Sequence, residues 1–386
     1  MSDYDLQTLL VHGGERPDPY TGAIAPNLVR SKTYKQEFGV NSKYEYSRAQ
    51  NPTRLVLEEK LACLEGGGRA SVFSSGLAAE ANLFLTLSPG DHIIIPSEVY
   101  GGTLRLLRNV FVPYGITYTQ SDLSSVENIK KNITPNTKYF FIEALTNPSL
   151  IPIDLELMDE VSMETSIPYI ADMTFCPPST MRAFDYGAFA VIHSVSKYLS
   201  GHNDVLAGVV ITRDDKLHDR LKFLQKTVGA ILSPDECYRC IQGIKTLQVR
   251  WEKVSESALE VASYLFDNEK ISRVLYPGLE SHPGHNIAEK YMRKGYGGVL
   301  SFEIASENCD LKKFVDEVQR DGIVTYGESL ASPETLLAYP YTMSHGSLTS
   351  EEKEKLKITP RLFRLSLGLE SPKDIIHELG RGLEAV

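Results

Sequence analysis

Residues 188–212 read AFAVIHSVSKYLSGHNDVLAGVVIT, in which a lysine flanked by serines and a polar loop separate two apolar segments. Both apolar segments are short and rich in strand-forming residues, so we expect two buried strands. Lys197 then lies just past the end of the first strand. One interpretation is a solvated lysine at a strand–loop junction. The other is a lysine in a partly dehydrated pocket, where a lowered pKa lets its amine form an imine and nearby hydroxyl groups hold an anion.

The chain around this stretch alternates between strand-like and helix-like segments from about residue 49 to residue 247. Strands are expected at ASVF, HIIIP, KYFFIEAL, PYIADMT, AFAVIHS and VLAGVVIT, with helices at LAAEANLFLTL, near TLRLLRNVF and at PIDLELMDEVSMET. This pattern predicts an α/β domain, residues 49–247, with a mostly parallel sheet covered by helices. Residues 1–48 are rich in turn formers and predict an extended arm. Residues 248–386 predict a smaller C-terminal α+β domain that begins with a long helix.

The composition excludes several classes of protein. With 40 Lys+Arg and 50 Asp+Glu the net charge is −10, which argues against nucleic-acid binding. No apolar run approaches the roughly 20 residues that span a membrane, and the N-terminus MSDYDLQTLL lacks the apolar core of a signal peptide. Five scattered cysteines fit reduced thiols and a cytoplasmic location better than a disulfide framework. Cys237 and Cys240 form a lone CxxC, so no metal site is expected.

The carboxyl ends of the expected strands, where ligands gather in parallel sheets, carry groups that suit a phosphate-bearing cofactor. Residues 74–76 (SSG) begin a helix whose backbone N–H groups can bind an anion, although a simple serine N-cap has the same sequence. Asp172, Asn147 and Lys197 follow three other strands. The chain has neither a Walker lysine nor a GxGxxG at these turns, so ATP or NAD is poorly supported. An anion site, an aspartate and then a lysine favour pyridoxal phosphate (PLP).

The segment SVSKYLSGHNDVLAGVV resembles the lysine signature of the Cys/Met-metabolism family of PLP enzymes. Other motifs are also similar to that family, namely YEYSRAQNPT, SSGLAA, VYGGTLR, TNP, PGLESHPGH and FRLSLGLE. The resemblance extends from about His12 to about Glu370, nearly the whole chain. It implies the aspartate-aminotransferase-like fold (PLP fold type I), with a seven-stranded, mostly parallel sheet and a smaller C-terminal domain.

The resemblance also implies roles at the cofactor. Lys197 would form the imine with PLP and later move protons between substrate carbons. Asp172 would pair with the ring nitrogen, and Tyr100 would stack on the ring and help accept a proton from the incoming amine. The phosphate would be surrounded by Ser75, Gly76, Leu77, Ser194 and Ser196. Tyr46 and Arg48 of the arm would reach the phosphate of a neighbouring subunit, which implies a catalytic dimer, and two such dimers are expected to form a homotetramer.

The same resemblance assigns residues to an amino-acid substrate. Arg364, in FRLSLGLE, would bind the α-carboxylate through two parallel hydrogen bonds. Asn147, which is also expected at the cofactor, and Ser329 would assist it. Arg105 and Glu334 would contact the distal amino or carboxylate group of the substrate. The expected partners are therefore small amino acids, and neither a nucleic acid nor a membrane.

The family acts at the β or γ carbon of sulfur- or oxygen-substituted amino acids. VYGGTLR is similar to the cystathionine γ-synthase and γ-lyase branch, so the expected reaction is γ-replacement on an O-acyl-L-homoserine-like substrate through a vinylglycine-type intermediate. Alternatives are γ-elimination from cystathionine or methionine, and capture of that intermediate by an unusual nucleophile in a specialised pathway. A non-catalytic relative of the fold is the alternative from another class. The joint presence of Lys197, Asp172, Tyr100 and Arg364 argues against it.

Several positions depart from the family pattern. Met173 replaces a polar residue in DMTF, Ser196 replaces the usual threonine before the lysine, and Ala207 replaces a common glycine. Arg30 and Lys32 stand where small hydroxyl residues usually line the substrate entrance. These two cations predict either a more acidic substrate or acceptor, or a salt bridge between subunits.

Overall fold

The computed structural model describes residues 4–346 and 348–386, and within them the large sheet has seven strands in the order β1-β7-β6-β5-β4-β2-β3. The strands are β1 (Arg69–Phe73), β2 (His92–Pro96), β3 (Thr117–Ser121), β4 (Thr137–Glu143), β5 (Tyr169–Asp172), β6 (Ala190–His193) and β7 (Gly208–Thr212). Strands β3, β2, β4, β5 and β6 run parallel, whereas β7 is antiparallel to both of its neighbours. The sheet is thus mostly parallel, as the sequence predicts.

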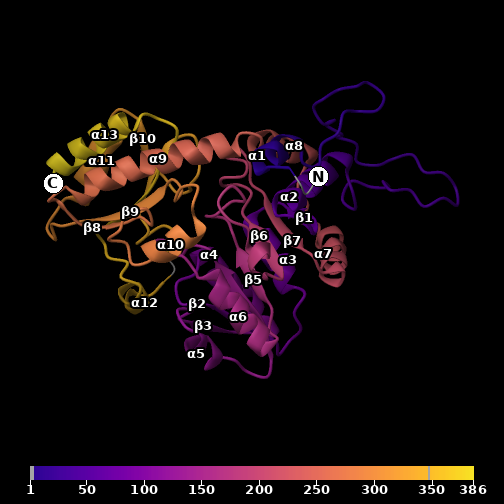
Figure 1. Cartoon of the computed structure of the whole chain (residues 1–386), viewed down its shortest axis with the longest axis horizontal. Coiled ribbons are helices and arrows are strands. Elements are labelled where there is room, and N and C mark those ends of the chain that lie inside the picture. The colour runs from indigo at the N-terminus through magenta and orange to yellow at the C-terminus, as the bar shows by residue number, and fades with distance from the viewer. Residues whose placement is uncertain (1–3, 347) are drawn as a thin grey trace.

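Helices cover both faces of this sheet (Figure 1). Alternate residues of one strand, such as Ile94 and Ile95 of β2, belong to different apolar clusters because their side chains face opposite sides. One cluster includes side chains from α2 (Pro52–Leu64), α6 (Leu155–Thr165), α8 (Pro234–Ile244) and α9 (Leu247–Phe266). The other includes side chains from α3 (Gly76–Phe84), α4 (Gly101–Leu106) and α7 (Asp215–Val228). Burial on both faces explains the continuous apolar runs of the central strands.

A second sheet of five described strands, in the order β10-β11-β12-β9-β8, lies against helix α9, at the end of the molecule opposite the N-terminal arm (Figure 1). Its strands are β8 (Ile271–Leu275), β9 (Val299–Ile304), β10 (Val324–Tyr326), β11 (Thr335–Ala338) and β12 (Leu362–Ser366). The helices of this part are α10 (His285–Tyr291), α11 (Leu311–Val318), α12 (Ser350–Lys355) and α13 (Pro372–Glu384). An apolar cluster of its own packs the sheet against α9, α11 and α13. The domain boundary at residue 248 stays a prediction, and it falls at the start of α9.

In the large α/β domain, two local features differ from the sequence interpretation. Strand β3, TYTQS, was not expected, because it is polar and partly exposed at the sheet edge, where it pairs with β2. The helix expected near residues 103–111 begins as α4 and continues as a π-helical turn over Leu107–Phe111 and a 3₁₀ turn over Val112–Tyr114. The short helices α1 (Leu6–His12) and α5 (Val126–Lys130) and a 3₁₀ turn over Ala183–Tyr186 complete the chain.

The arm expected over residues 1–48 is not extended throughout, because α1 packs Leu9 and Leu10 into the core. The chain after α1 extends away from the rest of the molecule (Figure 1). Within the described residues, positions 13–51 contain no helix or strand, only an isolated bridge between Thr33 and Tyr46. Large side chains of this arm, among them Tyr20, Ile24 and Phe38, are 80% exposed or more. No helix in the described part of the chain has the length and apolar character needed to cross a membrane.

Candidate active site

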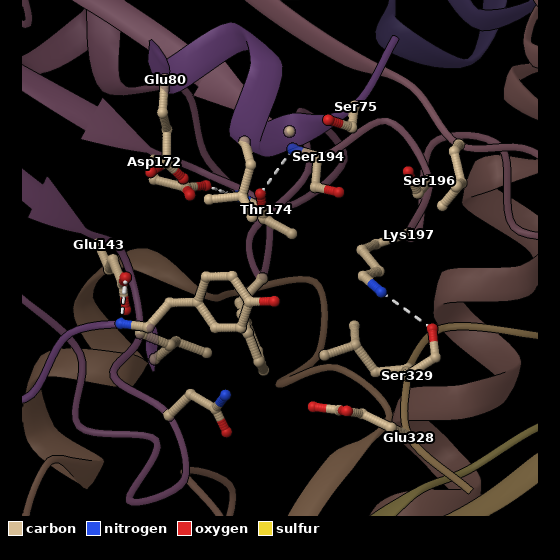
Figure 2. A pocket seen from close by; sticks show the side chains of 18 of the residues that line it. Ser75, Glu80, Glu143, Asp172, Thr174, Ser194, Ser196, Lys197, Glu328 and Ser329 are labelled. Carbon is tan, nitrogen blue, oxygen red and sulfur yellow. Dashed lines mark hydrogen bonds between the residues drawn. The ribbon is translucent and has the colours of Figure 1, made fainter. Parts of the chain in front are cut away.

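A cavity of about 430 Å³ opens at the carboxyl ends of β4, β5 and β6 and reaches β12 of the second sheet (Figure 2). Most residues that the sequence assigns to the cofactor and substrate line it, namely Ser75, Gly76, Leu77, Tyr100, Asn147, Asp172, Ser194, Ser196, Lys197, Ser329 and Arg364. Residues from both halves of the chain therefore meet in one cavity of a size typical for small-molecule sites.

Lys197 lies four residues past the end of β6 and points into the cavity (Figure 2). Its Nζ donates a hydrogen bond to Ser329 Oγ at 2.9 Å. Burial, followed by the positive charge of Arg364, lowers the pKa of Lys197 to about 8, while Glu328 opposes this shift. Roughly a tenth of the amine is therefore unprotonated at pH 7, far more than for a lysine of pKa 10.5, and this favours nucleophilic attack.

This lowered pKa predicts how fast the PLP-free protein should bond with added PLP. Only the neutral amine attacks an aldehyde, so the rate of colour formation should rise with pH and level off above a midpoint near 8. A lysine with an ordinary pKa of 10.5 would instead give a rate that still rises at pH 9.5. Stopped-flow absorbance measured from neutral pH to pH 9.5 distinguishes the two pH profiles. A midpoint near 10 would contradict a lowered pKa of Lys197.

Asp172 is the last residue of strand β5, which pairs with β6, the strand that precedes Lys197. Its Oδ1 accepts a hydrogen bond from the backbone N–H of Thr174 at 2.8 Å. Burial raises the pKa of Asp172, whereas the Thr174 hydrogen bonds and the nearby His193 lower it. No described lysine or arginine forms a salt bridge with it. A buried carboxylate without such a partner is suited to a cationic group of a ligand.

The start of helix α3 forms the anion-binding end of the cavity. Ser75 is the N-cap, and its Oγ accepts a hydrogen bond from the backbone N–H of Ala78 at 3.0 Å. A Cβ on Gly76 would lie 2.9 Å from the Cβ of Ser194, so only glycine allows the helix start to approach this loop so closely. Backbone N–H groups at a helix start attract a phosphate.

Ser196 differs from the other expected phosphate contacts. Its hydroxyl donates to the backbone carbonyl of Ala207 at 3.1 Å and accepts from the Ala207 N–H at 2.9 Å. The side chain lines the cavity, but its hydroxyl is already engaged in fixing the loop after Lys197. Leu77 and Ser194 also line this end, and their contact with a phosphate stays a prediction.

Arg364, on β12, is 3% exposed and faces the cavity. Its Nη1 donates to Asn147 Oδ1 at 3.1 Å and its Nη2 to the carbonyl oxygen of Ser329 at 2.9 Å, while its buried Nε has no partner. Ser329 has φ 130°, a strained conformation for a residue other than glycine. Asn147 and Ser329 thus hold a guanidinium group that retains free donor capacity for a carboxylate.

Tyr100 lies at the cavity rim, at the N-cap of α4, with its backbone N–H donating to Glu143 Oε1 at 2.7 Å. Burial, followed by the charge of Glu328, raises the pKa of the Tyr100 phenol, although Arg105 partly opposes this. The phenol is therefore neutral near pH 7, which suits stacking on a ring. Its expected role as a proton acceptor stays a prediction.

Two expected substrate contacts do not line the cavity. Arg105 and Glu334 are both exposed. Glu334 directly precedes β11, and its backbone carbonyl accepts a hydrogen bond from Ser332 Oγ. Glu328, in the loop after β10, does line the cavity beside Ser329 (Figure 2), so it is a further candidate for the distal contact expected of Glu334.

The arm residues lie outside the cavity of their own chain. The Arg48 guanidinium packs on the Tyr46 ring, 5.6 Å from its centroid, and its Nη1 donates to the carbonyl of Lys226 at 2.7 Å. Arg30 forms a salt bridge of 2.6 Å with Asp235 of the same chain, in the first turn of α8, which is neither of the two expected roles. Lys32 is exposed and forms no ion pair with any described residue.

Three carboxylates of the cavity were missed in the sequence. Glu80 lies one turn after Gly76 on α3, Glu143 ends β4, and Glu328 directly precedes Ser329. The position of Glu143 at a strand end was a usable signal. The other two depend on which side of a helix or loop faces the cavity, and a single sequence does not show this.

Comparison with known proteins agrees with this geometry. The family model described as "Cys/Met metabolism PLP-dependent enzyme" matches residues 7–384. The chain belongs to this family. It is 39% identical to a cystathionine beta-lyase of Coxiella burnetii, covering 98% of this chain and 97% of that protein. It is 38% identical to a cystathionine gamma-synthase of Mycobacterium leprae, covering 98% and 96%.

Among solved structures, cystathionine gamma-lyase from Lactobacillus plantarum complexed with L-serine superposes with a TM-score of 0.95 at 35% identity, covering 99% of each chain. The expected PLP type I fold is thus confirmed, and the chain is a PLP-dependent enzyme of Cys/Met metabolism. The three relatives carry three different reaction names, so their similarity does not assign a single reaction.

The residues of the cavity fit PLP. Gly76 leaves room at the anion-binding helix start, Asp172 offers a buried carboxylate for the ring nitrogen, and Lys197 offers an amine of lowered pKa for the aldehyde. These three groups lie around one cavity, which is the arrangement that a phosphate, a pyridine nitrogen and an aldehyde on one ring require.

Proposed function

We propose that the enzyme catalyses γ-replacement, joining the four-carbon part of an O-acyl-L-homoserine to the sulfur of cysteine to give cystathionine and a carboxylic acid. The observation that supports a site for cystathionine, as product or as substrate, is Glu328, and the similarity of VYGGTLR to the γ-synthase and γ-lyase branch favours γ-replacement. This carboxylate lines the same cavity as Lys197 and Arg364 and acts electrostatically on both. Cystathionine has an amino-acid group at each end, so a site for it needs one carboxylate-binding group and a second acidic group for the distal ammonium.

Each residue of the site has a separate role in this reaction. Bound PLP supplies an electron sink that stabilises negative charge on substrate carbons. Arg364 binds the α-carboxylate, held in place by Asn147 and Ser329. Lys197 Nζ, placed by Ser329 Oγ, removes a proton from Cα and then from Cβ and returns protons at the end of the reaction. Glu328 binds the ammonium group at the distal end of cystathionine and so orients that end of the molecule.

Cleavage of cystathionine is the second candidate function. The relatives named beta-lyase and gamma-lyase favour it, at 39% and 35% identity. Synthesis and cleavage would use the same groups, because cystathionine is the product in one case and the substrate in the other. Arg364 and Glu328 would bind the two ends of the molecule in both directions.

Product analysis of the PLP-loaded enzyme separates these reactions. O-acetyl- or O-succinyl-L-homoserine with cysteine should give cystathionine, measured by mass spectrometry. Cystathionine alone would give cysteine, 2-oxobutanoate and ammonia by γ-cleavage, or homocysteine, pyruvate and ammonia by β-cleavage. Rapid cleavage without synthesis would replace γ-replacement by the second candidate. Failure of both incubations would move the assignment to another nucleophile, such as one selected by the arm residue Lys32.

The substitution Glu328→Gln tests the distal-end assignment. It should lower kcat/KM for forming or cleaving cystathionine by about 10- to 100-fold, since a charge-assisted hydrogen bond contributes about 1.5–3 kcal/mol. Elimination from O-acetyl-L-homoserine, which has no distal ammonium, should change little. Glu334→Gln is the matched control and should leave both substrates unaffected, because Glu334 is exposed outside the cavity. Equal losses on the two substrates would mean that Glu328 does not bind the distal group.

We further propose that the enzyme works in the cytoplasm as a dimer of catalytic dimers. The exposed apolar side chains of the arm, such as Tyr20, Ile24 and Phe38, favour burial against a second copy. Tyr46 and Arg48 lie on the same arm and could then reach the partner's cavity. Light scattering on the purified enzyme measures the assembly, and a monomer of 43.0 kDa would contradict it.

A further inference from the structure

Glu80 has no role in the reaction proposed above, yet it lines the cavity. It extends from helix α3 toward Asp172 (Figure 2) and is 3% exposed. Its buried Oε2 and the buried Thr103 hydroxyl beside it make no hydrogen bond of regular geometry, although that hydroxyl lies close enough to stabilise the carboxylate. A buried carboxylate that has no cation beside it is costly in a folded protein, so its position beside Asp172 calls for a function.

The groups packed around Glu80 are acidic or neutral. Asp172 of β5 is its charged neighbour, Glu143 of β4 is coupled to both carboxylates, and α4 contributes Tyr100 and Thr103. Burial, and then the negative charge of Asp172, raises the pKa of Glu80 to about 8, with Thr103 opposing. Two neighbouring buried carboxylates resist ionising together, so one of them keeps its proton until a cation arrives.

We propose that Glu80 is a positioning residue that holds a proton beside Asp172 and releases it to solvent when the protonated ring nitrogen of PLP occupies this side of the cavity. Asp172 then contacts the ring, and Glu80 adds a second negative charge behind it. The chain thereby adjusts the charge that it presents to the ring nitrogen, and with it the electron-withdrawing strength of the ring. This inference rests on the proposed function in one respect, namely that the PLP ring nitrogen lies at Asp172. It does not depend on which amino-acid substrate the enzyme uses.

The experiment compares PLP binding by the PLP-free wild-type enzyme and by Glu80→Gln between pH 6.5 and pH 9.5. Below the lowered pKa that Glu80 has once PLP is bound, both proteins carry a neutral side chain, and their PLP affinities should agree within about twofold. Between that pKa and the value of about 8 in the PLP-free protein, binding removes the Glu80 proton, so the affinity of the wild type relative to the variant should rise with pH. Above pH 8 the ratio should level off, at about tenfold for each unit by which the ring cation lowers the pKa of Glu80.

The number of protons released on PLP binding provides the second measurement. In weakly buffered solution at pH 7, PLP binding should release more protons from the wild type than from Glu80→Gln. Glu98→Gln is the control, since Glu98 is another carboxylate of raised pKa but does not line the cavity, and it should match the wild type. If Glu80→Gln fails to fold, infrared spectra of the wild type still report whether a protonated carboxyl group is lost on PLP binding.

Two outcomes would overturn the inference. One is an affinity ratio between wild type and Glu80→Gln that is independent of pH, and the other is equal proton release by both proteins with no loss of a carboxyl signal. Neither depends on which substrate the enzyme uses. A failure to make or cleave cystathionine would defeat the proposed function alone, because the PLP measurements contain no substrate.

Discussion

Lys197→Ala should not show the absorbance band of the imine when it is loaded with PLP and should lose turnover by about 10³-fold or more. In the wild type the visible absorbance of PLP is expected to shift when the lysine amine bonds to the PLP aldehyde. The same amine, 2.9 Å from Ser329 Oγ, is placed to move protons at two substrate carbons. Alanine removes both functions at once, which makes this the largest effect that the site predicts.

Two further variants make the result specific. Lys197→Arg keeps a positive charge in the pocket but cannot form the bond, so it should behave like alanine in both colour and turnover. Lys216→Ala removes an exposed lysine of helix α7 and should match the wild type. The measurements are the visible spectrum after removal of free PLP and the steady-state rate. A Lys197→Ala protein that keeps the imine band and its activity would place the reacting amine elsewhere.

The site residues that the sequence predicted best are those that lie at or just after the end of a strand. Asp172 and Lys197 end or closely follow neighbouring parallel strands, β5 and β6, so their convergence follows from the sheet alone. The helix start at Gly76 could be expected in the same way. The local sequence pattern shows that each of these residues lies at a strand end or a helix start. The order of the strands then brings them together, independently of how individual side chains pack.

Residues outside that pattern were harder to predict. Glu80 is one helical turn past Gly76, and nothing in its local sequence shows that it faces Asp172 and not solvent. Glu328 and Glu334 lie in one segment between β10 and β11, and only the path of the loop decides which carboxylate enters the cavity. The salt bridge between Arg30 and Asp235 joins positions 205 residues apart, a contact that no local pattern contains.

Arg364→Lys should raise KM for every amino-acid substrate by about 30- to 1,000-fold, equivalent to about 2–4 kcal/mol, and change kcat much less. Arginine offers a planar pair of donors to the α-carboxylate, whereas lysine offers a single ammonium on a flexible chain. The same α-carboxylate contact exists before and during reaction, so its loss weakens binding in both states and appears mainly in KM. Arg361→Lys, on a residue next to β12 that bonds to the carbonyls of Ile304 and Ala305, is the control and should keep KM unchanged.

The pair Arg364→Lys and Arg364→Ala separates geometry from charge. The arginine's positive charge helps to lower the pKa of Lys197 to about 8, so lysine at 364 should keep the midpoint of colour formation there. Alanine removes this charge and should shift the midpoint to higher pH, because the protonated form of Lys197 is then less disfavoured. Alanine also frees the carbonyl of Ser329, whose hydroxyl accepts from Lys197, so kcat should fall as well as binding. If Arg364→Lys moved the midpoint as far as Arg364→Ala does, the guanidinium would act on Lys197 through the strained Ser329 and not through its charge.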